Sequence, residues 1–123
     1  MRDIKNNVDA QPSIDPASYS ADQTGTGIDL QDYDSAMAVV QVGAVVGNTH
    51  TPKIQESDDD STYNDVGTDD LEGDFVAASA NTVQRVGYKG AKRYIRVFVT
   101  STGASAIYGA TIVRGNAYVA PVA

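Results

Sequence analysis

The clearest pattern along the chain is a series of short apolar runs that recur roughly every ten residues, with turn residues between them. In RYIRVFVT, residues 93–100, Ile95, Val97 and Val99 alternate with polar or aromatic residues. A two-residue period places successive side chains on opposite faces of a strand, so this run predicts a β-strand with one buried face.

Other segments carry weaker forms of the same signal. The run AMAVVQVGAVV, residues 36–46, has β-branched residues on both alternating sets, which predicts a long strand, although its Ala and Met leave a helix open. Residues 53–57 and 62–66 flank DDDS and predict a hairpin, because Asp and Ser side chains hydrogen-bond to nearby amides in turns. Residues 82–88 predict a further strand, which the turn at residues 89–92 separates from RYIRVFVT.

The last apolar run, residues 107–113, follows the turn STGAS. Gly109 inside it predicts a bulge or a close approach of two backbones, and Gly115 and Asn116 predict its end before a short tail. Together the runs predict an all-β fold: one antiparallel β-sandwich, jelly-roll or immunoglobulin-like, of about seven or eight strands.

The first 27 residues differ from the rest of the chain. They are polar, include two prolines and the tract TGTG, and contain only isolated apolar residues such as Val8 and Ile14. We therefore predict an extended N-terminal arm over residues 1–27, mobile or ordered against a neighbouring subunit, and a sandwich domain over residues 28–123.

Composition limits the classes of protein to consider. A chain of 123 residues fits one domain, and the absence of cysteine excludes disulfides and thiolate metal sites. No apolar run approaches the roughly 18 residues of a membrane span, and the start lacks a signal-peptide pattern, so we expect a soluble protein made in the cytoplasm.

Charge is distributed unevenly. All 16 acidic residues lie in residues 1–74 with three bases, whereas residues 75–123 hold six bases and no acid, so the two parts carry −13 and +6 and sum to −7. Two interpretations stay open: folding interleaves the parts and cancels the charge, or complementary patches meet in an assembly.

The most acidic stretch, QESDDDSTYNDVGTDDLEGD at residues 55–74, raises the question of calcium. An EF-hand loop needs Gly at position six and Glu at position twelve, but a loop starting at Asp58 has Tyr63 at position six, and one starting at Asp60 has Leu71 at position twelve. A solvated hairpin tip is the favoured interpretation. The alternative is a different calcium site made of Asp58, Asp60, Asp65 and Asp69.

No catalytic motif stands out. Paired carboxylates alone do not indicate a glycosidase, and the chain has no Trp to wall a sugar site. His50, the only histidine, cannot form a multi-histidine metal site and is predicted to lie in a surface turn. The GTG of residues 25–27 is too short for a phosphate loop. The basic stretch at residues 85–97 has residue types that contact nucleic acid, but the overall acidity argues against that partner.

The order of several segments resembles small virion proteins of tailed bacteriophages that are encoded among head genes. These segments are MRDIKNN, KIQESDDDSTYNDV, DDLEGDF and VQRVGYKGAKRYIRVFV, followed by a last apolar strand, so the likeness covers most of the chain. Each segment is weakly specific, and their order carries the resemblance.

The resemblance implies a non-enzymatic capsid decoration or cement protein on the outer surface of the head shell, made in the cytoplasm of the host bacterium. The expected partners are the major capsid protein and other copies of the chain, with a trimer as one form, and no membrane or nucleic acid. It implies no catalytic, cofactor or metal residues. The alternatives are a tail or head-completion protein and a carbohydrate-binding sandwich that uses calcium.

Overall fold

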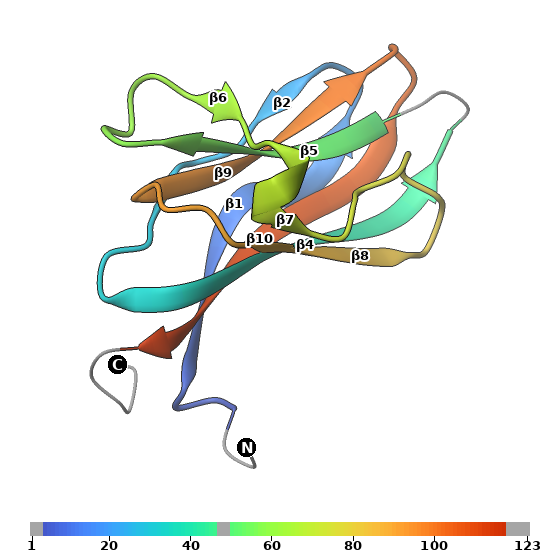
Figure 1. The fold of residues 1–123 in the computed structure, drawn as a ribbon. Coiled ribbons are helices and arrows are strands. Elements are labelled where there is room, and N and C mark those ends of the chain that lie inside the picture. Colours follow the sequence, from blue (N-terminus) through green and yellow to red (C-terminus); the bar gives the residue numbers. More distant parts are fainter. Residues whose placement is uncertain (1–3, 47–49, 118–123) are drawn as a thin grey trace.

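The protein is a β-sandwich, as the sequence predicts. The computed structural model describes residues 4–46 and 50–117, and in this part of the chain two antiparallel sheets lie face to face (Figure 1). Apart from one 3-10 turn, η1 (Thr68–Asp70), the elements are strands: β1 (Val8–Tyr19), β2 (Gln23–Thr24), β3 (Ile28–Asp29), β4 (Tyr33–Val45), β5 (His50–Ser57), β6 (Asn64–Asp65), β7 (Leu71–Glu72), β8 (Val83–Tyr88), β9 (Tyr94–Ser101) and β10 (Ala106–Ala117). No described helix is long and apolar enough to cross a membrane.

The strand order identifies a jelly roll. Sheet A has the order β1-β10-β4-β8-β7, and sheet B has the order β2-β9-β5-β6, with β3 also paired to β9. The pairs are nested: β1 pairs with β10, β2 and β3 with β9, β4 with β8, and β5 with β6. This is one long antiparallel hairpin rolled into two sheets, which is the jelly-roll arrangement rather than the immunoglobulin one.

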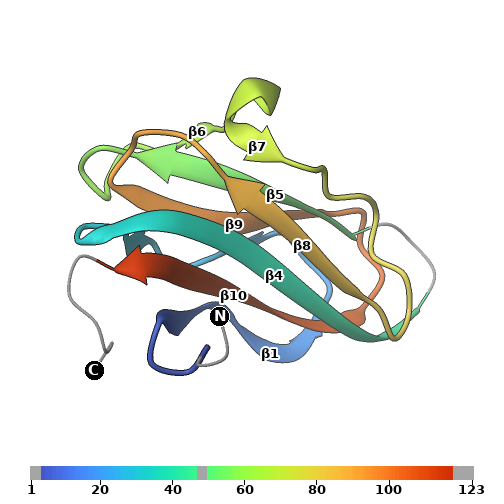
Figure 2. The same ribbon diagram turned by 60° about the horizontal axis from the view of Figure 1, so that its bottom comes forward.

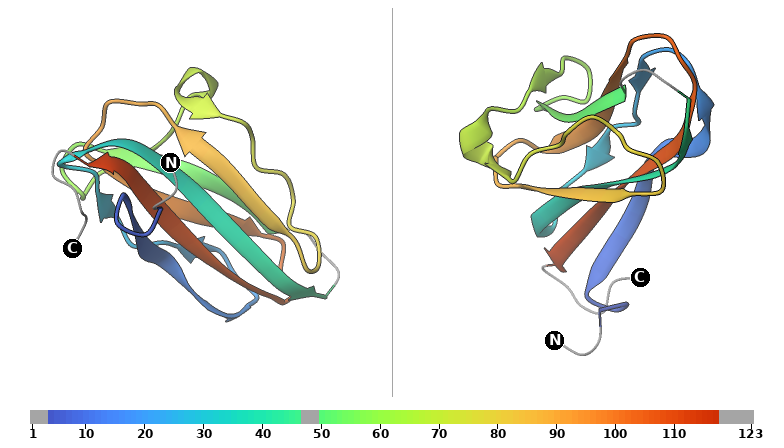
Figure 3. Two further views of the ribbon diagram at one scale, coloured as in Figure 1. Left: turned by 90° about the horizontal axis from the view of Figure 1, so that it is seen from below. Right: turned by 90° about the vertical axis from the view of Figure 1, so that its right-hand side faces the viewer.

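The core lies between the sheets and is built from the predicted alternation. In β9, Ile95, Val97 and Val99 are buried and face the buried residues 38, 40 and 42 of β4. The two layers are seen edge-on in the right panel of Figure 3. The hairpin predicted around DDDS is also confirmed, because β5 and β6 pair from Gln55 with Asp65.

The predicted N-terminal arm is wrong for most of its length. Val8–Tyr19 forms β1, pairs with β10 along its length and buries Ile14, whose side chain is 5% exposed. The segment is extended, as expected, but it belongs to the sandwich. Its sparse apolar residues suffice because β1 is an edge strand of sheet A and presents few side chains to the core.

The tract TGTG joins the two sheets at this edge. The buried Ser13 hydroxyl accepts a hydrogen bond from the Val97 amide at 3.1 Å and donates to the Thr26 carbonyl at 3.0 Å. The Gly25 amide donates to the Val97 carbonyl at 2.8 Å, and a Cβ at Gly25 would lie 2.5 Å from that oxygen. Glycine is therefore required for close packing here. We call the hydrogen bonds that join Ser13, the tract TGTG and Val97 the seam between β1 and β9.

Two further turns differ from their predictions. The residues after β8 do not close a hairpin: β8 lies in sheet A and β9 in sheet B, so residues 89–93 cross between the layers. Strand β10 runs to Ala117 instead of ending at Gly115, because its later residues stay paired with β1 and β4. Gly109 does mark a close approach, since a Cβ there would lie 3.0 Å from the Pro16 ring.

Candidate interaction surfaces

The acidic residues around the β5–β6 loop are held by separate local partners. Asp58 accepts a hydrogen bond from Lys92 at 2.9 Å, and Asp60 accepts one from the Tyr63 hydroxyl. Asp65 accepts from Lys53 and from Gln55 at 3.1 and 3.0 Å. In residues 4–46 and 50–117, no group of three or more His, Asp or Glu side chains is placed to hold a metal ion. The geometry therefore gives no support to the calcium alternative.

Asp59 shapes the loop tip. Its carboxylate accepts hydrogen bonds from the Thr62 and Ser61 amides, each at 3.0 Å, and from the Ser57 hydroxyl at 2.8 Å. These bonds, that from Thr62 first, hold the pKa of the Asp59 carboxyl below its usual range. The carboxylate therefore stabilises the turn.

His50 is buried, which corrects the prediction of a surface turn. It begins β5, is 1% exposed, and its Nε2–H donates to the Ala104 carbonyl at 2.6 Å. Its ring lies against Tyr108, with the centroids 5.6 Å apart. The His50 hydrogen bond therefore links the start of β5 to the turn before β10. Because its ring is buried, His50 cannot act as a ligand at the surface.

The bases of the C-terminal part are mostly neutralised within the chain, as the interleaving interpretation expects. Four of the six pair with acids of the N-terminal part: Lys89 with Glu72, Lys92 with Asp58, Arg93 with Asp29 and Arg114 with Asp9. A fifth, Arg96, donates to Gln55 at 2.9 Å and lies 3.9 Å from the centre of the Tyr63 ring. The basic stretch is therefore not a free cationic patch.

Arg85 is the exception among these six bases. It is exposed, and it has no ion pair or hydrogen bond with the described residues. It lies opposite Val39 in the pairing of β8 with β4, and Val39 lies opposite Thr111 of β10. Cross-strand partners share a face, so Arg85 stands on the outer face of sheet A.

This outer face is largely apolar, and besides Arg85 it carries Glu72, which lies opposite Gly87 and pairs with Lys89 at 3.6 Å. Figure 2 shows β10, β4 and β8 side by side in front of β9 and β5, so it views the face directly. We define the outer face of sheet A by the residues Pro12, Met37, Val39, Gln41, Glu72, Val83, Arg85, Ile107, Thr111 and Val113. Val83 is 61% exposed and Ile107 is 47% exposed. An antiparallel sandwich commonly has polar side chains on such a face, so its apolar character needs an explanation.

The same face is hollowed. A groove of about 560 Å³ runs over β10 and β4, with Gly43 and Gly109 among its lining residues and Val83 and Ile107 beside them. A side chain at Gly43 would contact Ile107, and one at Gly109 would meet Pro16, so both glycines allow close packing within this face. None of the described residues that line it is acidic.

The outer face of sheet B is different. Its outward side chains include Lys53, Gln55 and Arg96, which are bound to Asp65, or to one another, by hydrogen bonds. Lys53 also lies 5.2 Å from the centre of the Phe98 ring. This face is polar and internally satisfied, so the two faces of the sandwich have distinct chemistry.

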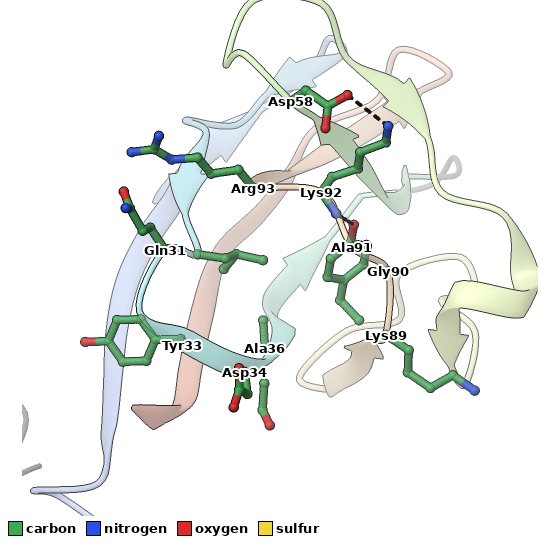
Figure 4. Close-up of a pocket in the computed structure, with 13 residues that line it drawn as sticks. Gln31, Tyr33, Asp34, Ala36, Asp58, Lys89, Gly90, Ala91, Lys92 and Arg93 are labelled. Carbon is green, nitrogen blue, oxygen red and sulfur yellow. Dashed lines mark hydrogen bonds and ion pairs between the residues drawn. The ribbon is translucent and has the colours of Figure 1, made fainter. Parts of the chain in front are cut away.

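A second hollow lies at the end of the sandwich, where the β3–β4 turn, the β5–β6 loop and the β8–β9 crossover meet (Figure 4). Its volume is about 450 Å³. Tyr88 forms part of its wall, and the Tyr88 hydroxyl donates to Glu56 at 2.7 Å and accepts from the Lys92 amide at 3.1 Å. Burial, together with the hydrogen bond to Glu56, raises the pKa of the Tyr88 hydroxyl.

The sequence predicted neither surface as a site. The sequence does contain a signal for the apolar outer face of sheet A. A strand with one solvent-exposed face usually has polar residues in one of its two alternating sets, but in residues 36–46 both sets are apolar. The end hollow had no such signal, since its walls come from three separate segments that only the fold brings together.

Comparison with known proteins identifies the fold but no family. No protein-family model matches the chain, and no curated protein sequence matches it. The structure is similar to the SPBc2 prophage-derived protein YomS, with a TM-score of 0.56 and 10% identity over 88% of this chain and 92% of that one. A protein of Bacillus endospore appendages has a TM-score of 0.47 at 10% identity, covering 89% of this chain and 88% of that one. PirA has a TM-score of 0.46 at 9% identity, covering 93% and 98%. The likeness to YomS shows a shared fold.

Proposed function

We propose that this chain is a structural protein of a tailed-phage virion, of the capsid decoration or cement type, and that it binds the outer surface of the head shell through the outer face of sheet A. The observation that carries this proposal is the largely apolar character of that face, with exposed Val83 and Ile107 beside a groove whose described lining residues include no acid. Contiguous apolar surface on a small chain is typical of a protein-binding site.

The unpaired cation on this face indicates the chemistry of its partner. The face carries two charged side chains, Arg85 and Glu72, and Glu72 pairs with Lys89 at 3.6 Å, whereas Arg85 has no ion pair with the described residues. A partner that covers the face would therefore have to supply an acid to Arg85. We therefore assign the face to the major capsid protein, through an apolar patch that presents an Asp or Glu to Arg85. A homo-oligomer, such as a trimer, would form through other surfaces.

The fold and its likeness are compatible with this function. Jelly rolls occur in viral capsid domains and also in lectins, so the fold by itself does not select a function. The prophage-derived origin of YomS agrees with a phage source for this chain. A protein that binds only the assembled shell stabilises the shell by mass action, which is the effect expected of a cement protein.

The test is binding to shells assembled from the major capsid protein without this chain. We expect the purified chain to sediment with such shells, and Val83→Asp to weaken binding by at least about tenfold, because the new carboxylate would be desolvated in an apolar interface. The matched control is Thr100→Asp, an exposed position of β9 on the outer face of sheet B, which should bind as the wild type does. Thermal unfolding of both variants verifies that each is folded.

Arg85→Glu tests the charge component separately. We expect it to weaken shell binding, and Arg85→Lys to retain most of it at low salt. If the chain does not sediment with shells and is absent from virions by mass spectrometry, the proposal is wrong. Sedimentation with tails in place of heads would support the tail alternative.

A further inference from the structure

The outer edges of the two sheets differ in how their backbone groups are satisfied. In β5, of which β6 covers only two residues, the His50 carbonyl accepts a hydrogen bond from the Ala78 amide at 2.7 Å. The Ile54 carbonyl accepts one from the Val66 amide at 3.2 Å, and Pro52 has no N–H to satisfy. The edge strand β1 contains two prolines and two register shifts, which hinder pairing with another chain. Both of these edges are therefore occupied or protected.

The edge of β8 is different. The neighbouring strand β7 is two residues long and pairs only with Gly87 and Tyr88, at the end of β8 (Figure 2). Gly73 follows β7 with a φ of 98°, a left-handed conformation that ends the strand. In the part of the chain that the structure describes, no strand therefore pairs with the outer edge of β8 from Val83 to Val86.

The pairing register identifies the backbone groups that face this edge. Along an antiparallel strand, residues whose N–H and C=O bond to one neighbour alternate with residues whose groups point the opposite way. The Val42 amide donates to the Thr82 carbonyl at 2.8 Å, so Thr82 bonds toward β4. Gln84, two residues later, bonds in the same direction. Val83 and Arg85, on either side of Gln84, therefore direct their N–H and C=O groups to the outer edge.

The other end of β8 agrees with this assignment. Gly87, two residues after Arg85, pairs with Glu72 of β7, and the Lys89 amide donates to the Asp70 carbonyl at 2.7 Å. Residues 87 and 89 thus bond to the β7 side. The same line of groups continues to residues 85 and 83, where β7 has ended.

The connection from β7 to β8, residues 73–82, leaves these groups unbonded. Its Val76 backbone is held by the Gln84 side chain, with bonds of 2.9 and 3.0 Å, and its Ala78 amide bonds to β5 of sheet B. In the right panel of Figure 3 this segment, in yellow, arches over β8 on the side that faces sheet B. It makes no hydrogen bond with the backbone of Val83 or Arg85 within the described ranges.

The same two residues carry unsatisfied side chains. Val83 is 61% exposed, and Arg85 has no ion pair with the described residues. Both side chains lie on the outer face of sheet A. A strand added at this edge would place alternate side chains on the same face, directly opposite Val83 and Arg85. An apolar residue and an acid, two positions apart in that strand, would match them.

We propose that the Val83–Arg85 edge of β8 binds an extended acidic segment of the shell protein as an additional antiparallel strand of sheet A, with a carboxylate of that segment on Arg85. Backbone hydrogen bonds supply affinity in this mode of binding, and alternate side chains supply specificity. The added strand continues the line of β7, which is itself antiparallel to β8. The inference deepens the proposed docking function, and it rests on that function for the identity of the partner.

Charge distinguishes this partner from a second copy of the chain. The sequence of β8, VQRVGY, contains no acid. Two β8 strands paired edge to edge would therefore offer no carboxylate to Arg85 from the opposite strand.

The experiment is an NMR titration of the full isotope-labelled chain with the synthetic peptide acetyl-Thr-Glu-Thr-Val-Thr-amide. In antiparallel pairing its Glu lies opposite Arg85 and its Val opposite Val83. We expect the amide signals of these two residues to shift on binding. The same peptide with N-methyl groups on Glu and Val cannot donate to the two edge carbonyls, so it should bind about tenfold more weakly.

Arg85→Gln tests the charge. The wild type should bind this peptide more tightly than its Gln analogue, and Arg85→Gln should remove the difference. The matched control is Lys53→Gln, which removes a cation from the outer face of sheet B and should retain the preference for Glu. Thermal melting verifies that both variants are folded.

The outcomes separate strand addition from docking in general. If the signals of Val83 and Arg85 do not shift at millimolar peptide, or if the N-methylated peptide binds equally well, strand addition is wrong even when the chain sediments with shells. Peptide binding at this edge without sedimentation supports the strand site and refutes the shell as its partner. Dimerisation of the chain that protects these two amides from hydrogen exchange would identify a second copy as the occupant, and would also overturn the proposal.

Discussion

Ser13 provides the sharpest test of how the sandwich is closed. Its side chain is 5% exposed, and its hydroxyl accepts the Val97 amide hydrogen at 3.1 Å while donating to the Thr26 carbonyl at 3.0 Å. Replacing Ser13 with Ala removes one oxygen and leaves the backbone of β1 unchanged. The Val97 amide would then have no acceptor within a buried stretch of β9, because Val97 itself is completely buried.

The size of the effect follows from these two bonds. A buried donor that loses its partner costs about 1–3 kcal/mol, and the bond to Thr26 adds about 1 kcal/mol. Thr26 is exposed, so water can replace the second bond more easily than the first. We expect Ser13→Ala to lower the free energy of unfolding by about 2–4 kcal/mol, and to lower the melting temperature by about 10 °C for a domain of this size.

The assay is urea unfolding at neutral pH, followed by circular dichroism, with thermal melting as a second measure. The matched control is Ser18→Ala, which makes the same change at an exposed position of the same strand and should cost less than about 0.5 kcal/mol. A loss below about 1 kcal/mol for Ser13→Ala would show that water replaces the hydroxyl, and that the seam does not hold β1 against β9.

Two pH-dependent effects follow from the titratable groups. The hydrogen bond from Arg93 holds the pKa of the Asp29 carboxyl below its usual range, so its stabilising effect is complete above about pH 4 and is lost as the pH falls through the lowered pKa. Asp29→Asn should therefore flatten the acid limb of the urea midpoint plotted against pH, and an unchanged limb would contradict this. Burial raises the pKa of Tyr108 to about 12, so stability should decline as the pH rises from about 10 toward 12. Because the Tyr108 hydroxyl is buried without a partner in the described structure, Tyr108→Phe should raise stability at pH 7 by about 1 kcal/mol and reduce the alkaline loss; destabilisation at pH 7 would refute this.

Local patterning predicted most of the fold, because strands with one buried face leave a period in the sequence. The alternation of residues 93–100 and the Asp-rich turn after Ser57 are local signals, and both elements are present. The prediction of an arm failed because β1 has few apolar side chains, and its place in the sheet depends on backbone pairing with β10, about a hundred residues away. Backbone hydrogen bonds leave no trace in the identity of the side chains.

The errors at His50 and at the β8–β9 crossover have the same origin. A polar residue between a turn and a strand suggests exposure, but the burial of His50 is set by its neighbour Tyr108 and by the Ala104 carbonyl. The turn after Tyr88 has the composition of a hairpin turn, yet the two strands that it joins belong to different sheets. Turn chemistry fixes local dihedral angles, and the choice between pairing and crossing is made by the packing of the whole sandwich.

The nested pairing of the jelly roll explains why the uneven charge of the sequence does not survive folding. Because β1 pairs with β10 and β3 with β9, acids of the first part of the chain meet bases of the last part, as in the pairs Arg93–Asp29 and Arg114–Asp9. The charge split therefore serves intramolecular pairing, and it gives no separate argument for assembly. Arg85 has no such partner, because the residue opposite it in β4 is Val39, and Glu72, the acid on the same face, pairs with Lys89. A partner is therefore expected at this one cation and the apolar surface around it, and not at two oppositely charged halves.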